Sequence, residues 1–186
     1  MVQVLCLDAA GSPTEWLSIE DAAKCILRGI VAWDLGETFY TLRGGRNAIT
    51  GRLSTIEVKP IISIRSPVHF QTANKTPPFG RSVLLRRDRL TCAYCGQVFK
   101  ESELTLDHIH PQSRGGLTDY MNIVAACESC NNGKACRTPE EAHMPLLYVP
   151  YVPSLQEKFI LENRVILADQ AEFLKASVPK DSRLWS

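Results

Sequence analysis

The feature that most constrains this chain is a pair of cysteine couples. Cys92 and Cys95 form the first couple, and Cys127 and Cys130 form the second. A Cys-x-x-Cys turn lets two thiolates reach one ion, and a second such turn completes the tetrahedral four-sulfur shell that suits Zn²⁺. Turn-forming residues follow each couple, Gly after the first and Asn-Asn-Gly after the second. The spacing therefore predicts a structural zinc site.

Two disulfides are the alternative use of the same four cysteines. The first residues, MVQVLCLDAAGSP, lack the basic region and the long apolar core of a signal peptide. We therefore expect a cytoplasmic, reducing location, where metal binding is favoured over disulfides. No apolar run approaches the roughly 20 residues of a membrane span, so no membrane association is expected.

A set of polar residues lies between and beside the cysteines, namely Asp107, His108, Asn122 and Asn131. The segment LTLDHI alternates apolar and polar residues, which predicts a strand that presents Asp107 and His108 at its end. NIVAAC predicts a second short strand, and a helix is expected from Asn131. Such a unit would bring Asp107 and Asn131 together as oxygen ligands of one hard cation such as Mg²⁺. His108 would lie beside the cation as a general base, because histidine is the side chain that titrates nearest neutral pH.

These residues resemble a known family. LDHIHPQSRGG, Asn122 and CESCNNGK together are similar to the His-Asn-His (HNH) endonucleases, also called ββα-metal nucleases. The resemblance extends to the HNH domain of RNA-guided CRISPR effectors, which shares the DHI-x-PQS and N-x-GK strings. It implies that Asp107 binds the catalytic metal and that His108 activates the attacking water. It also implies that Asn122 fixes the loop that holds His108, and that Asn131 is the second metal ligand.

The chemistry of phosphodiester hydrolysis fits this set. The reaction needs an in-line water, a base for its proton, and a cation on the scissile phosphate. We therefore expect a DNA endonuclease with Mg²⁺ or Mn²⁺ as catalytic cofactor beside the structural Zn²⁺, and the resemblance implies 5′-phosphate and 3′-hydroxyl products. One alternative is a non-catalytic zinc module that binds DNA or protein, which would not need the polar set. Another is an HNH nickase that acts on RNA or within a phage packaging or restriction system.

The distribution of charge supports a nucleic-acid partner, although the net charge is only +1. Residues 43–89 contain ten Lys and Arg against two acidic residues, whereas residues 140–172 have a net charge of −4. A basic half could follow a phosphate backbone; a merely solvated basic surface is the alternative. The candidates for substrate contact are His110, Arg114, Lys134, Arg86 and Arg87.

Residues 1–70 are expected to form a small α/β region that supports or recognises DNA. The predicted elements are strands at 2–7, 30–33, 38–42 and 54–66, and a helix from Ser18 to Gly29. The strands at 30–33 and 38–42 are expected to be joined by a turn at 34–37, and Pro60 to mark a break. The basic segment RGGRNAITGR (43–52) is either a loop against DNA or only a hairpin turn. The region also resembles, more loosely, the N-terminal part of one bacterial and phage branch of HNH proteins.

The remaining chain is divided by composition. We expect a linker at 71–80, the zinc-containing nuclease domain at 81–140 with a leading helix at 82–90, and an extended arm followed by a C-terminal helix at 141–186. Ser154 and Glu157 form a capping box for that long helix, which would serve a homodimer or dock on its own chain. The predicted class is α+β: a ββα-metal unit stapled by a four-cysteine zinc site, preceded by a small α/β region and followed by a C-terminal helix.

Overall fold

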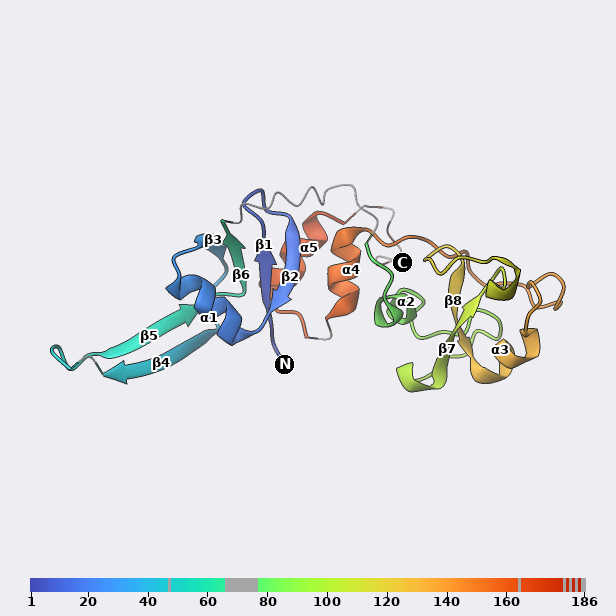
Figure 1. Cartoon of the computed structure of the whole chain (residues 1–186), viewed down its shortest axis with the longest axis horizontal. Helices are drawn as coiled ribbons and strands as arrows, with labels where there is room; N and C mark the ends of the chain where they lie inside the picture. Colours follow the sequence, from blue (N-terminus) through green and yellow to red (C-terminus); the bar gives the residue numbers. More distant parts are fainter. Residues whose placement is uncertain are drawn as a thin grey trace. The chain divides into compact units, whose positions relative to one another are not determined.

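The chain forms two compact units (Figure 1). The computed structural model describes residues 1–46, 48–65, 77–163, 165–178, 180, 182 and 184. The first unit comprises Met1–Lys75 and Asn163–Val178, and the second comprises Thr76–Glu162 and Pro179–Ser186. Most of the predicted linker at 71–80 lies outside the described residues.

A four-stranded sheet forms the centre of the first unit, with the order β2-β1-β6-β3. Its strands are β1 (Val4–Leu7), β2 (Pro13–Leu17), β3 (Val31–Leu35) and β6 (Ile61–Ile64). β1 runs parallel to β6, while β2 and β3 are antiparallel to their neighbours. Helix α1 (Ile19–Leu27) buries Ala22 in a core with Val4 and Ile62. Helix α5 (Ala168–Ala176) is attached by Gln170, whose buried amide donates to the carbonyls of Gln3 and Pro60, each at 2.7 Å.

The other two strands of this unit form a separate two-stranded sheet. β4 (Tyr40–Arg46) pairs antiparallel with β5 (Leu53–Val58). The strands predicted at 30–33 and 38–42 both exist, but the predicted turn at 34–37 begins too early, since β3 continues to Leu35. The two strands do not pair with each other: β3 pairs with β6 and β4 with β5. Pro60 does separate β5 from β6, because proline cannot donate to a sheet. β2 was not predicted.

The second unit contains the cysteines. Its elements are α2 (Arg81–Arg87), η1 (Glu101–Glu103), β7 (Leu104–His108), η2 (Gln112–Arg114), β8 (Ile123–Cys127), α3 (Glu128–Lys134) and α4 (Leu155–Glu162). β7 and β8 are antiparallel, with Asp107 opposite Val124 and His108 opposite Ile123. All five residues of β8 are buried. The predicted strand–loop–strand–helix order is therefore confirmed.

A buried ion pair locks α2 to β8. The Arg87 guanidinium binds the carboxylate of Asp88 at 2.7 Å and donates to the carbonyls of Tyr120, Ile123 and Tyr151. Asp88 in turn accepts the amide of Ala125 at 2.9 Å. Every one of these groups is hydrogen-bonded, so the buried charges are compensated. The bonds to Ile123, the first residue of β8, and to Ala125 hold this strand against the end of α2.

The long C-terminal helix was wrong: α4 and α5 are separate helices. The Asn163 side chain accepts the amide of Val165 at 3.2 Å, a local turn that competes with helix continuation. Arg86 donates to the carbonyls of Leu161 and Glu162 at the end of α4. In a longer helix these carbonyls would accept hydrogen bonds from the amides of the next turn. The capping box of Ser154 and Glu157 is confirmed, with bonds of 2.5 and 3.2 Å.

Both helices bury apolar residues. Phe159 and Leu161 of α4, and Leu174 of α5, are all buried. Of the two roles expected for the C-terminal helix, docking on its own chain is the one this burial favours. In the part of the chain that the structure describes, no helix is long and apolar enough to cross a membrane.

Candidate functional site

The four cysteine sulfurs converge on one point in the second unit. The Sγ atoms of Cys92, Cys95, Cys127 and Cys130 all lie within 4.8 Å of one another, and all four are free thiols rather than disulfides. A tetrahedral Zn²⁺ with Zn–S bonds of about 2.3 Å sets its sulfurs about 3.8 Å apart. The cluster is therefore of the right size and chemistry for zinc, as the spacing predicts.

Backbone hydrogen bonds hold the first cysteine turn against β8. The amide of Gly96 donates to the carbonyl of Cys92 at 3.0 Å, and the amide of Ala93 donates to the carbonyl of Ala125 at 2.8 Å. Gly96 has φ of +72°, a left-handed conformation that glycine adopts without a steric cost. The second couple needs no separate turn, because Cys127 ends β8 and Cys130 lies on α3.

The surroundings of the sulfurs act on their protonation in opposite directions. Burial raises the pKa of Cys92, but hydrogen bonds from the backbone amides of Cys95, Cys127 and Tyr94 outweigh it and lower the pKa to about 7. Burial and the neighbouring Cys127 raise the pKa of Cys130. A metal must therefore displace protons from the cluster, and its affinity falls as the pH falls.

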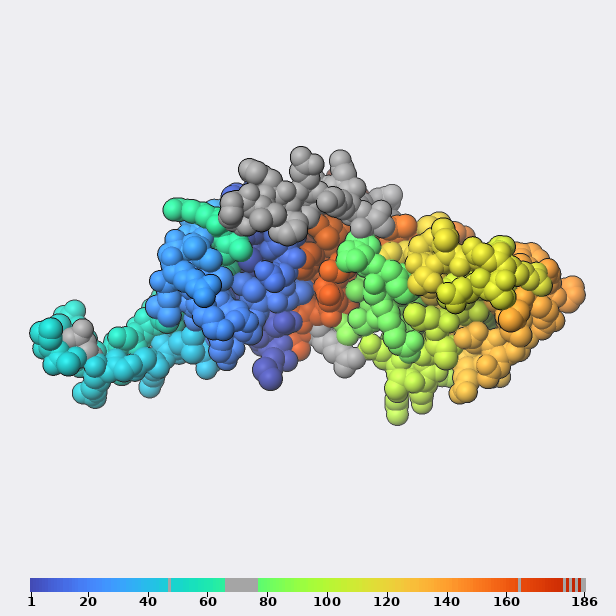
Figure 2. All heavy atoms as spheres, in the orientation of Figure 1, coloured from blue at the N-terminus to red at the C-terminus, as the bar shows by residue number. Residues whose placement is uncertain are grey.

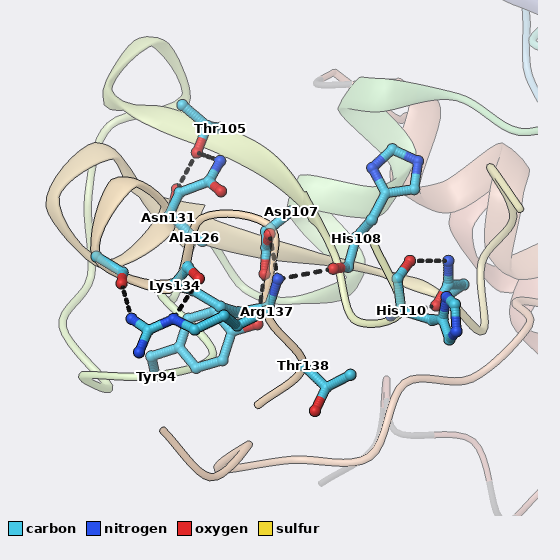
Figure 3. Close-up of polar contacts among 12 residues, drawn as sticks. Tyr94, Thr105, Asp107, His108, His110, Ala126, Asn131, Lys134, Arg137 and Thr138 are labelled. Carbon is cyan, nitrogen blue, oxygen red and sulfur yellow. Dashed lines mark hydrogen bonds and ion pairs between the residues drawn. The ribbon is translucent and has the colours of Figure 1, made fainter. Parts of the chain in front are cut away.

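Asp107 is the one carboxylate of the polar set, and only 4% of its surface is exposed. Its Oδ1 lies 3.0 Å from Lys134 Nζ, and its Oδ2 accepts the hydroxyl of Tyr94 in a short hydrogen bond (Figure 3). Lys134 is fully buried, and its ammonium also donates to the carbonyl of His108 at 2.9 Å. The carboxylate thus joins three segments: the zinc turn through Tyr94, the strand β7, and the end of α3 through Lys134.

Tyr94 connects the zinc turn with the carboxylate because it lies between the two cysteines of the first couple. Burial and the bond to Asp107 both raise the pKa of Tyr94, so its hydroxyl remains protonated and donates. The Tyr94 ring also packs against the cluster of Cys92, Ala126 and Cys127. The hydrogen bond to Asp107 was not expected, because nothing in the local sequence shows which side chain a tyrosine hydroxyl reaches.

His108 points away from this buried pair and is half-exposed. Its Nε2 lies 3.0 Å from the hydroxyl of Thr118 in the loop between β7 and β8. Adjacent residues of a strand face opposite sides, which explains why Asp107 is interior while His108 faces the loop. Thr118 was missed by the sequence analysis, since no motif or periodicity marks it.

Asn122 closes the same loop on itself. Its side chain accepts the amide of His110 at 2.8 Å and donates to the carbonyls of His110 and Leu117 at 3.1 and 2.8 Å. A Cβ at Gly116 would lie 1.9 Å from the His110 carbonyl oxygen, so only glycine fits there. This geometry agrees with the loop-fixing role that the resemblance implies for Asn122.

Asn131 contacts Thr105, not Asp107. Its amide nitrogen donates to Thr105 Oγ1 at 2.8 Å, and that hydroxyl donates to the carbonyl of Ala126 at 2.9 Å. Thr105 can only accept from Asn131, because its own proton is committed, and the Asn131 amide oxygen is the atom left for a metal. On the face of α3 that meets β7, Asn131 lies beside Thr105 and Lys134 beside Asp107 (Figure 3).

The substrate candidates fall into two groups. Arg87 and Lys134 are buried in ion pairs and Arg86 binds the end of α4, so the structure gives all three a structural role instead of a phosphate contact. His110 and Arg114 remain exposed. Arg114 donates to both carboxylate oxygens of Glu141 at 2.8 and 2.9 Å, and this bond lowers the pKa of Glu141.

A cation bound between β7 and α3 would find one carboxylate, that of Asp107, and one amide oxygen, that of Asn131. Asp107 offers about four lone-pair positions, of which Lys134 and Tyr94 occupy two. The amide oxygen of Asn131 is the second donor on the same face of α3 and β7. Apart from the four cysteines, no group of three or more converging His, Cys, Asp or Glu ligands occurs within the described ranges. The donor set therefore suits a hard cation that takes its other ligands from water or substrate.

Replacing a cysteine of the cluster should remove zinc and destabilise the second unit. We expect Cys95→Ser to lose bound zinc and to lower the free energy of unfolding by roughly 3 kcal/mol or more, because metal binding is coupled to folding. Native mass spectrometry and urea unfolding measure the two effects. Cys136→Ser is the matched control, since Cys136 is an exposed cysteine outside the cluster. Equal zinc content and stability in both variants would contradict a structural zinc.

The contact between Tyr94 and Asp107 can be tested with a double-mutant cycle. Tyr94→Phe should cost about 1–3 kcal/mol, because a hydrogen bond to a charged group is lost. Combined with Asp107→Asn, the two losses should be less than additive by about 1 kcal/mol or more. The same cycle with Tyr148→Phe should be additive, because the Tyr148 hydroxyl donates to the carbonyl of Thr91 instead. Additivity in both cycles would remove the link between the zinc turn and Asp107.

Comparison with known proteins finds similarity in the same segment of the chain. Residues 92–147 match a family model described as HNH endonuclease. Over 51 residues the chain is 39% identical to the CRISPR-associated endonuclease Cas9 of Corynebacterium diphtheriae. That match covers 27% of this chain and 5% of the length of that curated relative.

A solved structure, the crystal structure of the Type II-C Cas9 enzyme from Actinomyces naeslundii, also matches. The identity is 24% and the TM-score is 0.32, with 54% of this chain and 13% of that chain covered. A likeness this distant carries no argument about function. The family match instead rests on residues 92–147, which include all four cysteines and the whole polar set. This segment of the chain, with its four-cysteine centre, belongs to the HNH endonuclease family.

Proposed function

We propose that this protein is a metal-dependent endonuclease that hydrolyses phosphodiester bonds of DNA. The observation that carries the proposal is the pair Asp107 and His108 at the end of β7. One is held in the interior by Tyr94 and Lys134, and the other is directed into a loop fixed by Asn122. A carboxylate that can bind a cation and a half-exposed histidine that can accept a proton are two of the groups that metal-assisted hydrolysis uses.

His108 is the proposed general base. Its ring takes the proton of the attacking water, and the Thr118 hydroxyl, 3.0 Å from Nε2, orients the ring. The Asn122 bonds to both polar backbone groups of His110 keep the chain beyond His108 in one conformation. A base held in one orientation is already positioned to accept the proton of the water, so little entropy is lost in orienting it during the reaction. Such positioning supplies a large part of the rate enhancement at a catalytic site.

Asp107 and Asn131 are the proposed ligands of Mg²⁺ or Mn²⁺. The cation supplies positive charge to the scissile phosphate and to the leaving oxygen. Lys134 holds the Asp107 carboxylate in place and is therefore a positioning residue in this proposal. Of the exposed candidates, His110 and Arg114 remain available for substrate, although phosphate would have to compete with Glu141 for Arg114.

One such site cuts one strand. A double-strand break would therefore need two events or two copies of the chain. A homodimer through the C-terminal arm and helix is part of our expectation, but the apolar residues Phe159, Leu161 and Leu174 are already buried in the single chain and give it no support. Nicking is the activity that this chain alone is proposed to have.

The buried ion pair favours one alternative, a non-catalytic zinc module that binds DNA or protein. In such a module the pair of Asp107 and Lys134 would only stabilise the fold, and His108 would have no chemical task. Replacement of His108 distinguishes the two functions. A nuclease would lose cleavage, whereas a binding module would keep its full affinity for its partner.

Replacing His108 should abolish cleavage without unfolding the protein. We expect His108→Asn to reduce the rate of nicking of supercoiled plasmid, with Mg²⁺ or Mn²⁺, by at least about 100-fold, because a general base contributes about 10²–10⁴. His143→Asn is the matched control: His143 is exposed, and asparagine tolerates its φ of +55°. Nicking by the folded His108→Asn variant at the wild-type rate would disprove the base. A folded, zinc-loaded wild type that binds but never cuts would favour the zinc module.

Replacing Asn131 should change the metal requirement. We expect Asn131→Ala to raise the Mg²⁺ concentration for half-maximal nicking by about 10- to 100-fold, and Thr105→Val to raise it less, since Thr105 only orients the amide. The fold should persist, because Asn131 lies at a partly exposed position. Asn132→Ala, at the exposed neighbouring position, should leave the requirement unchanged. An unchanged Mg²⁺ dependence in Asn131→Ala would remove Asn131 from the ligands.

A further inference from the structure

The hairpin of β4 and β5 projects from the first unit (Figures 1 and 2). Only its base packs on the unit: Leu42 and Ile56 face each other across the two strands and contact the core that contains Ala22 of α1. Beyond these two residues, every described position from 43 to 55 is exposed. We call this outer part, the described residues 43–46 and 48–55, the hairpin arm.

Stability of the unit does not explain the hairpin arm. A two-stranded sheet with neither face covered is marginal in water, because it buries little apolar surface. Ile49, near its turn, is 95% exposed, which is unfavourable for so large an apolar side chain in a free surface loop. An arm that adds nothing to the core and exposes an apolar residue at its tip is suited to contact with a partner.

The charge of the arm indicates which partner. Arg43, Arg46 and Arg52 all lie on it, and no acidic residue occurs between positions 38 and 56. None of the ion pairs found among the described residues involves these three arginines. Three exposed guanidinium groups on a stretch of chain that has no acidic residue suit a polyanion, since arginine binds phosphate oxygens with two donors at once.

The geometry of the arm favours double-stranded DNA. The major groove is about 12 Å wide and admits a two-stranded ribbon. The register of the hairpin shifts between Arg43 and Arg46, where Gly44 and Gly45 lie, and such a bulge increases the twist of a ribbon. Ser54 and Thr55, opposite this bulge, add hydroxyl groups that can donate to phosphates or base edges.

We propose that the hairpin arm is a DNA-binding ribbon that grips duplex DNA through Arg43, Arg46 and Arg52. The inference rests on the proposed function, because that function makes DNA the substrate. The arm supplies affinity for the phosphate backbone, while the HNH segment performs the cleavage. Binding and cleavage thus depend on different residues of the chain.

The test is a comparison of two triple variants in a His108→Asn background, which removes the proposed cleavage. One variant is Arg43→Gln, Arg46→Gln and Arg52→Gln. The matched control is Arg28→Gln, Arg65→Gln and Lys175→Gln, which removes three exposed positive charges from the same unit outside the arm. Fluorescence anisotropy with a labelled duplex DNA of about 25 base pairs, at several salt concentrations, gives Kd and its salt dependence.

The arm variant should raise Kd by at least about tenfold and reduce the slope of log K against log salt by about 2 to 3, since each lost phosphate contact contributes about 0.9. The control should change Kd by less than about threefold. Equal losses in both variants would show a non-specific charge effect and overturn the proposal, as would an unchanged arm variant. Preferred binding of single strands or RNA by the unaltered arm would overturn the duplex as its partner.

The same variants without the His108 change separate this inference from the proposed nuclease. If the protein binds duplex DNA through the arm but never nicks it, the proposed nuclease function is wrong and the proposed DNA binding by the arm is right. If the protein nicks plasmid and the arm variant nicks it with the same KM, the proposed nuclease function is right and the proposed DNA binding by the arm is wrong. Where both are right, the arm variant should raise KM and leave kcat within about threefold, because its effect is on binding alone.

Discussion

The hydrogen bonds of the Asp107 carboxylate are the contact on which the HNH segment depends. A carboxylate buried without partners would cost several kcal/mol. Here Lys134 at the end of α3 and Tyr94 in the zinc turn each bind one of its oxygens. The three segments satisfy the buried charge only when the zinc turn, β7 and α3 are all in place. The geometry of the proposed catalytic carboxylate is therefore a consequence of the same folding event that assembles the four sulfurs.

The strand β7 then divides its two polar residues between different surroundings. Asp107 faces the interior and His108 faces the loop that Asn122 closes, because neighbouring side chains of a strand point to opposite sides. From the other side, the buried pair of Arg87 and Asp88 fixes β8, to which β7 is hydrogen-bonded. The position of His108 is thus defined by interactions on both strands, and none of them is made by its own side chain except the contact with Thr118.

The sequence could predict what depends on short spacing or local periodicity. The cysteine cluster, the strand that ends at His108, the strand before Cys127 and the capping box at Ser154 are all of this kind, and the structure has each of them. What it could not predict depends on contacts between distant segments. Lys134 was expected to be near phosphate, yet it is buried on Asp107, and Arg87 is bonded to carbonyls 33 to 64 positions away. The break between α4 and α5 depends on an asparagine turn and on Arg86, neither of which disturbs the apolar pattern that suggested one helix.

The pairing of Lys134 with Asp107 has a consequence for the proposed cation. An ammonium 3.0 Å from the carboxylate cancels its charge, so the pair as a whole attracts a divalent cation weakly. Asn131, the other proposed ligand, is neutral. A DNA phosphate would bring the negative charge that the protein ligands lack, and cation and substrate would then bind more tightly together than either alone. Two ligands that bind cooperatively raise each other's affinity by the same factor. The cation site would therefore have a low occupancy until DNA is bound, and cleavage would be confined to the complex with substrate.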